Sequence, residues 1–177
     1  RDFPDSPFKD CFVKDFSIIE NDPEVDVVVE TIGGAKVALE FTTRALKAGK
    51  SVVSSNKELV ATHGYELLQL AKANGVSYLF EASVGGGIPI LRPLTNCLAA
   101  NEVEQITGIL NGTTNYILTK MVQEGAGFEE TLREAQRLGY AEADPTADIE
   151  GIDACRKACI LADLLFGKHT DPNKVFT

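Results

Sequence analysis

The stretch from Gly139 to Lys157 holds the densest group of side chains that could do chemistry. Five carboxylates fall within a dozen residues, at Glu142, Asp144, Asp148, Glu150 and Asp153. If a helix begins near Asp148, then Asp153 and Lys157 stand four residues apart on one of its faces. A lysine beside a carboxylate, at the border of an apolar face, can donate a proton to a carbonyl oxygen that is becoming an alkoxide. The plainer alternative is an ordinary salt bridge on a helix that Asp148 caps.

Three shorter runs are further candidates. Lys57 ends the polar run 54–57 and could hold a phosphate, a nicotinamide amide or a substrate carboxylate; alternatively it is a solvated lysine in the first turn of a helix. Residues 84–88 include three consecutive glycines, and with Glu81 nearby they could hold a small cation through oxygen atoms. Their alternative is a tight turn between domains. Residues 111–115 are a third polar loop, or only a turn and a helix cap.

Short strands alternate with helices in the first part of the chain, which indicates a parallel sheet. Three β-branched or apolar runs are expected to form strands, the first of them buried on both faces, at residues 25–30, 51–54 and 76–80. One helix should end at Gly49, and the next should run from an N-cap at Asn56 to Gly75. Ligands bind beyond the carboxyl ends of such strands, so the loops 31–34, 54–57 and 81–87 should meet at one edge.

After residue 81 the pattern changes, and we expect a second domain. Its expected elements are a helix through Ala100, a strand at 103–110, helices ending near Gly125 and Leu138, and a last helix at 149–166. The first twenty-odd residues, which contain Pro4, Pro7 and Pro23, are expected to be irregular. No G-x-G-x-x-G dinucleotide loop occurs in the chain. From the residues alone, the chain is half of an α/β nucleotide domain followed by an acidic catalytic or binding module.

The composition is that of a globular protein. Of the 177 residues, 44% are hydrophobic and 24% are charged, so the chain can build a core. Because the net charge is −9 and no basic stripe is present, neither nucleic acid nor an anionic membrane is an expected partner. The four cysteines form no metal-binding pattern and are expected to be buried free thiols in a reducing compartment. The chain begins with Arg1 rather than Met, as expected of a processed or trimmed chain.

The acidic stretch closely resembles the signature of the homoserine dehydrogenase family, DP-x-x-D-x-x-G-x-D-x-x-x-K. Every spacing is met, by Asp144-Pro145, Asp148, Gly151, Asp153 and Lys157. Residues 55–57, 81–89 and 108–116 look like the same family, so the resemblance covers roughly residues 24–177. It implies an α/β fold, with a partial Rossmann-like parallel sheet in residues 1–81 and an α+β catalytic domain in residues 82–177.

The resemblance also implies an activity and a role for each site residue. The family reduces L-aspartate 4-semialdehyde to L-homoserine with NADH or NADPH, on the route to threonine, methionine and isoleucine. Lys157 would donate the proton to the aldehyde oxygen, and Lys57 would be a second catalytic lysine beside the nicotinamide. Glu142 and Asp153 would bind the ammonium and hydroxyl ends of the substrate, and Asp148 would orient the signature loop.

Further contacts follow from the same resemblance. Thr31, Lys57 and Gly139 would contact the cofactor, NADP or NAD. A monovalent cation, sodium in the family, would be held by Glu81 and the backbone of Val84, Gly86 and Ile88. A homodimer in the cytoplasm, or in a plastid if the source is a plant, is the expected setting.

Two other interpretations stay open beside this one. The chain could be a non-catalytic ligand-binding remnant of the same fold, or a related amino-acid semialdehyde oxidoreductase. Because the family opens with a glycine-rich loop that is missing here and continues beyond the last helix, we expect an internal fragment that is inactive alone. The sequence leaves the preference between NADH and NADPH open, since the residue that reads the ribose 2′ position should lie after an earlier strand.

Overall fold

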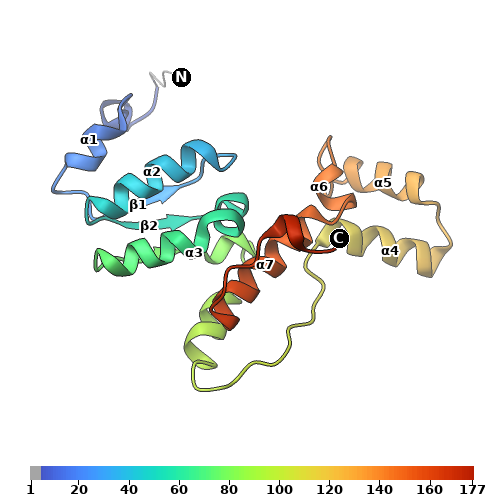
Figure 1. Cartoon of the computed structure of the whole chain (residues 1–177). Coiled ribbons are helices and arrows are strands. Elements are labelled where there is room, and N and C mark those ends of the chain that lie inside the picture. The colour runs from blue at the N-terminus through green and yellow to red at the C-terminus, as the bar shows by residue number, and fades with distance from the viewer. Residues whose placement is uncertain (1–4) are drawn as a thin grey trace.

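The computed structural model describes residues 5–177, which fold into two lobes with one long helix between them (Figure 1). The sheet lobe contains α1 (Phe16–Asn21), β1 (Val27–Glu30), α2 (Lys36–Lys47), β2 (Ser51–Ser54), α3 (Lys57–Ala73) and β3 (Tyr78–Leu79). The helical lobe contains α4 (Gly112–Glu124), α5 (Phe128–Arg137) and α6 (Thr146–Ile149), and α7 (Ile152–Phe166) lies between the lobes. Single helical turns lie at Lys9–Cys11, Glu81–Ser83, Pro93–Cys97 and Pro172–Lys174.

The sheet has three parallel strands in the order β1-β2-β3, as the strand–helix alternation predicts. Side chains alternate between its faces. Val52 and Tyr78 lie on the face that α2 and α3 cover, where they join the hydrophobic core. On the other face Val29, Val53 and Leu79 stand side by side in register and stay exposed, by 67%, 36% and 59%. The face of β1 that carries Val29 is therefore open, and the expectation that this strand is buried on both faces is wrong.

Local signals in the sequence place the end of α2 and both ends of α3 correctly. The backbone of Gly49 and Gly75 has positive φ, at 77° and 68°, where a helix stops and any side chain would be strained. Asn56 caps α3, because its side-chain oxygen accepts a hydrogen bond from the N–H of Leu59 at 3.0 Å. These ends matter because they place Lys57 directly after the carboxyl end of β2.

The start of the chain is more ordered than expected. Residues 16–21 form α1, which Asp15 caps through the N–H of Ser17. The ring of Phe16 stacks on Phe41 of α2 with 4.5 Å between ring centroids. Periodicity missed this helix because it is shorter than two turns and depends on packing against α2. The expectation for residues 1–4 lies outside the described residues.

Three expectations for the second half are also corrected. The helix expected to reach Ala100 is reduced to a few residues ending in the π-helical turn Pro93–Cys97. Residues 103–110 are extended but are not a strand, because no strand of residues 5–177 pairs with them. The last helix begins at Ile152 rather than 149, since Gly151 adopts a left-handed conformation with φ of 73° and separates α6 from α7.

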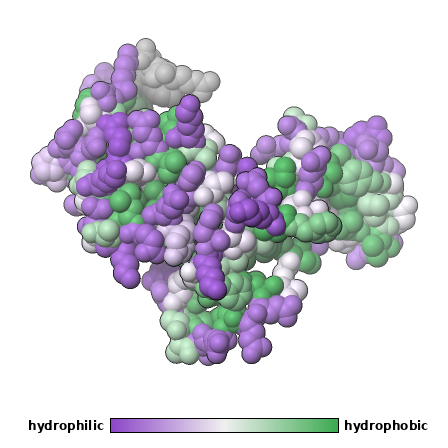
Figure 2. All heavy atoms as spheres, in the orientation of Figure 1, coloured by the Kyte–Doolittle hydropathy of each residue, from purple (hydrophilic) through white to green (hydrophobic). Residues whose placement is uncertain are grey.

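The hydrophobic core continues from the sheet lobe into α7. Ile160 and Leu161 of α7 are 2% exposed and belong to the same core as Leu59 and Leu67 of α3. Figure 2 shows apolar side chains gathered over the helical lobe, where Val122 of α4 is exposed. None of the helices within residues 5–177 combines the length and the apolar character that a membrane-spanning segment needs. The proposed division of the chain at residue 82 stays a prediction.

Candidate active site

Helix ends bring the candidate side chains together from both lobes. Lys57 is the first residue of α3, and Asp153 and Lys157 lie on the first turns of α7. Asp148 belongs to α6, and Asn111 caps α4 by accepting a hydrogen bond from the N–H of Thr114 at 2.8 Å. These elements meet beyond the carboxyl end of β2, the edge at which parallel sheets bind ligands.

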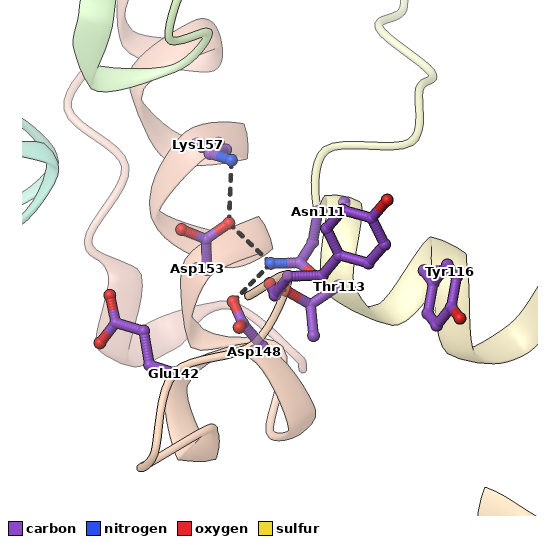
Figure 3. Close-up of a pocket in the computed structure, with 9 residues that line it drawn as sticks. Asn111, Thr113, Tyr116, Glu142, Asp148, Asp153 and Lys157 are labelled. Atoms are coloured by element: carbon purple, nitrogen blue, oxygen red, sulfur yellow. Dashed lines mark hydrogen bonds and ion pairs between the residues drawn. The ribbon is translucent and has the colours of Figure 1, made fainter. Parts of the chain in front are cut away.

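Asp153 is the centre of the cluster. One carboxylate oxygen pairs with the ammonium of Lys57, and the other accepts from Lys157 Nζ at 2.9 Å. The second oxygen also accepts from Asn111 Nδ2 at 3.0 Å (Figure 3). Asp153 is 8% exposed, so these three donors replace its hydration. The i,i+4 pair expected from the sequence is thus present, together with a second lysine from the start of α3.

The environment of Asp153 favours its ionised form. Burial acts to raise the pKa of its carboxyl group, but hydrogen bonds from Lys57, Asn111 and Lys157 act against burial and hold the pKa below its ordinary value. Asp153 therefore holds two ammonium groups in place, and each of them carries N–H donors. Such a site is suited to a ligand oxygen that gains negative charge.

Lys157 is held by a second contact. Its Nζ donates to the carbonyl oxygen of Leu110 at 2.7 Å, and its side chain is 15% exposed. An ammonium group has three N–H donors, and these two contacts use two of them. No group within residues 5–177 accepts from the third donor, so this N–H remains available to a ligand. The extended segment that ends at Leu110 thus takes part in the site although it forms no strand.

Asn111 connects α4, α6 and α7. Residues 111–115 therefore do more than form a turn and a helix cap, which was the alternative interpretation of this run. Besides capping α4 and contacting Asp153, Asn111 donates from its Nδ2 to Asp148 Oδ1 at 2.7 Å. Asp148 is thereby fixed against α4 and α7. This geometry agrees with a role of Asp148 in orienting the loop around it, which stays a prediction.

Two pockets open around Asp153, and they share Glu142, Asp148 and Asp153 as walls. One has a volume of about 530 Å³ and extends toward the helical lobe; the other has about 360 Å³ and extends toward the loop after β1. Thr31 and Lys57 line the smaller pocket, and Lys157 lines the larger. Glu142 is exposed, and its carboxylate has no hydrogen bond within residues 5–177, so it remains available to a ligand (Figure 3). The structure thus brings together six predicted residues: Lys57, Lys157, Glu142, Asp148, Asp153 and Thr31.

The remaining predicted residues line neither pocket. Gly139 ends α5 with φ of 79° and lies next to Tyr140, which does line the larger pocket. The residues of the expected cation site lie after β3 and are Glu81, Val84, Gly86 and Ile88. Glu81 accepts hydrogen bonds from the backbone N–H groups of residues 90–92 at 2.5 to 2.8 Å. Burial would raise the pKa of Glu81, but these hydrogen bonds lower it overall.

Sequence reasoning missed part of the pocket wall. Tyr116, Tyr140 and Arg156 have no predicted role, and Thr113 belongs to the candidate run 111–115 without a predicted role of its own. The two tyrosine rings are tilted against each other with 5.1 Å between centroids, and Thr113 Oγ1 donates to the carbonyl of Tyr140 at 2.8 Å. The run after Asn111 is a signal that could have found Thr113 and Tyr116. No sequence signal shows the ion pair between Arg156 and Glu58, whose partners meet only in the fold.

The free cysteines are partly as expected. Cys155 and Cys159 of α7 are buried, and burial raises the pKa of the Cys159 thiol to about 12. Cys11 and Cys97 are exposed, which corrects the expectation of four buried thiols. They lie in the single turns Lys9–Cys11 and Pro93–Cys97, neither of which contains a buried residue.

Comparison with known proteins gives consistent matches. A family model described as homoserine dehydrogenase matches residues 89–177, and one described as homoserine dehydrogenase, NAD binding domain, matches residues 9–81. The latter match starts earlier than residue 24, where the resemblance was expected to begin. The chain is 54% identical to the homoserine dehydrogenase of Bacillus subtilis over 151 residues, which are 85% of this chain and 35% of that protein. The chain thus spans about a third of the length of the curated relatives it matches.

Solved structures agree with these matches. The homoserine dehydrogenase of Thiobacillus denitrificans is 50% identical, with a TM-score of 0.86 over 92% of this chain and 38% of that one. A hyperthermophilic archaeal homoserine dehydrogenase in complex with NADPH is 34% identical, with a TM-score of 0.80 over 89% of this chain and 49% of that one. Together with the parallel sheet, these neighbours confirm the predicted fold class.

Proposed function

Because the chain belongs to the homoserine dehydrogenase family, we propose that it forms the substrate site of an enzyme that reduces L-aspartate 4-semialdehyde to L-homoserine. The observation that supports this most is the convergence of Lys57 from α3 and Lys157 from α7 on the buried carboxylate of Asp153. The pockets on either side of this cluster have room for a small amino-acid substrate and for the reactive end of a cofactor.

We assign the proton transfer to Lys157. A carbonyl oxygen that receives a hydride on its carbon becomes an alkoxide, and a lysine N–H within hydrogen-bond reach both stabilises that charge and supplies the proton. Lys157 keeps one N–H for this contact, and Asp153 and Leu110 fix the position of its Nζ. Lys57, on the other side of Asp153, adds a second positive charge and borders the smaller pocket.

The acidic residues suit the other end of the substrate. Aspartate semialdehyde carries an ammonium group, and the carboxylate of Glu142 stands exposed in both pockets with no partner of its own among the described residues. We assign Glu142 to that ammonium, Asp153 to the hydroxyl end of the product, and Asp148 to holding the loop. The last role is supported by its hydrogen bond with Asn111.

The residues around the smaller pocket fit a nicotinamide cofactor, NADP or NAD. Its walls include Thr31 and Gly33 after β1 and Lys57 after β2, at the strand ends where Rossmann-like sheets bind dinucleotides. A Cβ built on Gly33 meets no atom within 4 Å, so the loop leaves open space beside the backbone. When bound, the cofactor supplies the hydride. Gly139 is kept as a third proposed contact, although it lines neither pocket.

The residues of the expected cation site fit a sodium ion less well than the smaller pocket fits a nicotinamide cofactor. The turn at residues 84–88 offers carbonyl oxygens, and the carbonyl of Ile88 lies against Gly85. Both oxygens of Glu81, however, already accept backbone N–H groups. No group of three or more histidine, cysteine, aspartate or glutamate side chains within residues 5–177 could hold a metal ion. The cation at Glu81, Val84, Gly86 and Ile88 remains a proposal, and no step of the reaction depends on it here.

We further propose a homodimer in the cytoplasm. The dimer rests on the family resemblance and is supported by apolar side chains that stay exposed on the helical lobe, such as Leu118 and Val122. The cytoplasmic location rests on the biosynthetic role and on the four cysteines, all of them free.

A hybrid enzyme tests the function directly. This chain replaces the matched segment of the Bacillus subtilis homoserine dehydrogenase, and NADPH oxidation is followed with L-aspartate 4-semialdehyde and with short aldehydes that lack the amino-acid group. We expect the hybrid to reduce the semialdehyde with strong preference, and the 177-residue chain alone to be inactive because it has no G-x-G-x-x-G loop. A folded hybrid without activity would favour a binding remnant, and activity without preference would favour another aldehyde reductase.

A further inference from the structure

Both N–H donors and the carbonyl oxygen of the Asn56 side chain make hydrogen bonds, which join a loop to a helix. Its Nδ2 donates to the carbonyl oxygens of Ile32 and Gly34, at 2.7 and 2.8 Å. Its Oδ1 accepts from the N–H of Leu59 at 3.0 Å, which caps α3. Asn56 is 9% exposed, so these bonds are shielded from water. One residue therefore connects the loop after β1 with the helix that begins at Lys57.

Two buried groups extend this connection. The backbone N–H of Asn56 donates to Ser54 Oγ at 3.0 Å, and Ser54 Oγ donates to Glu30 Oε2 at 2.5 Å. The other oxygen of Glu30 accepts from the N–H of Ile32 at 2.6 Å. Glu30 and Ser54 are 4% and 2% exposed. The carboxyl ends of β1 and β2 are thus tied together by a closed network of side chains.

The loop after β1 depends on this network. Residues 31–34 have no regular structure, and Thr31, Ile32 and Gly33 are exposed. The backbone turns at Gly34, where φ is 79°. Within residues 31–34, the carbonyl groups of Ile32 and Gly34 accept their hydrogen bonds from Asn56. An exposed loop with so few contacts is expected to open locally when these bonds are lost.

We propose that Asn56 is a positioning residue that sets the distance between the loop 31–34 and Lys57, the two sides of the smaller pocket. Thr31 and Gly33 form one wall of that pocket and Lys57 another. A helix cap alone would need only the Oδ1 atom. The amide group of asparagine supplies in addition the two N–H donors that hold the loop. The consequence for cofactor binding rests on the proposed function, whereas the geometric role does not.

The substitution Asn56→Asp separates the two roles. Aspartate keeps an oxygen that caps α3 well, but it offers no N–H to the carbonyls of Ile32 and Gly34. Asn74→Asp is the matched control, because Asn74 lies at the other end of α3, is exposed, and its side chain donates only to the carbonyl of Leu70. Hydrogen–deuterium exchange of the 177-residue chain at pH 7 measures both regions. We expect Asn56→Asp to raise amide exchange in residues 31–35 by about tenfold while α3 keeps its protection, and Asn74→Asp to leave the loop unchanged.

Two results would overturn the proposal. Unchanged exchange in residues 31–35 of Asn56→Asp would reduce Asn56 to a helix cap. Loss of protection in the loop and α3 together would make it a general structural residue. If Asn56→Asp does not fold, Asn56→Ser takes its place, because serine also caps a helix but cannot bridge to both carbonyls. Unchanged amide exchange of residues 31–35 in Asn56→Ser would equally contradict the proposal.

The hybrid enzyme then measures the consequence for catalysis. We expect Asn56→Asp to raise the KM for NADPH about tenfold and to lower kcat, and Asn74→Asp to change neither. A hybrid that is inactive with Asn56 intact counts against the proposed function, and the exchange experiment still decides the role of Asn56. An active hybrid in which Asn56→Asp keeps its KM for NADPH counts against the positioning role alone.

Discussion

At the residue scale, the proposed site is built around one buried carboxylate between two lysines. The spacing of Asp153 and Lys157 on a helix predicts their contact, because residues four apart share a face. The contact of Lys57 with Asp153 joins residues 96 positions apart in the sequence. No local pattern contains that information, and only the resemblance to a family placed both lysines in one site. Lys157 gains its contact with Leu110 in the same way, through the fold.

The lowered pKa of Asp153 predicts how acid affects stability. A carboxyl group with a lower pKa in the folded state stabilises the fold above its ordinary pKa of 3.8, and this contribution is lost as the pH falls through the folded value. Asp153→Asn removes the contribution. The difference in free energy of unfolding between wild type and Asp153→Asn should therefore be largest at pH 7 and should shrink below about pH 4, when measured by urea denaturation.

Asp26→Asn serves as the control for that series, because Asp26 is exposed. Its difference from wild type should stay small at every pH. A constant difference for Asp153→Asn across the range would show that its ion pairs with Lys57 and Lys157 do not favour the ionised carboxylate.

At the scale of elements, caps and stop signals are readable from the sequence, whereas pairing partners are not. Asn56, Gly49 and Gly75 act where their residue types predict. The extended segment 103–110 has the composition of a strand, but a strand also needs a neighbour, which the described residues do not supply. The short helix α1 was missed for the opposite reason, because its stability comes from packing on α2.

Gly151 gives a test of the break between α6 and α7. Its φ of 73° is a conformation that residues with a Cβ adopt at a cost of about 1–2 kcal/mol. Gly151→Ala should therefore lower the free energy of unfolding by about 1 kcal/mol in urea denaturation. Gly112→Ala is the matched control: Gly112 begins α4 and its added Cβ would meet no atom within 4 Å, so stability should stay equal or rise slightly. Equal losses in both variants would contradict the account.

At the scale of the whole molecule, the sequence indicates a parallel sheet and the edge at which its ligands bind. The cluster around Asp153 does lie beyond the carboxyl end of β2. What composition could not indicate is which surface stays open. The face that carries Val29, Val53 and Leu79 is exposed, and α7 joins the core of the sheet lobe although it comes from the other half of the chain.

The open sheet face predicts self-association of the 177-residue chain. Exposed apolar side chains on a sheet with unpaired edges favour contact with another copy. Val29→Lys puts a charge on the β1 side of this face and should lower the apparent mass at high concentration in analytical ultracentrifugation. Val37→Lys is the control, since Val37 is an exposed apolar residue of α2. If both variants associate as wild type does, this face takes no part in association.

In the proposed reaction Lys157 donates the proton to the aldehyde. The most direct test of this step is the steady-state kinetics of the hybrid enzyme with Lys157→Ala, compared with Lys72→Ala, which removes an exposed lysine at the end of α3. We predict that Lys157→Ala lowers kcat by roughly 100-fold to 10,000-fold and changes the KM for L-aspartate 4-semialdehyde far less, while Lys72→Ala changes neither. A rise in KM with kcat unchanged would make Lys157 a binding residue and would contradict the account.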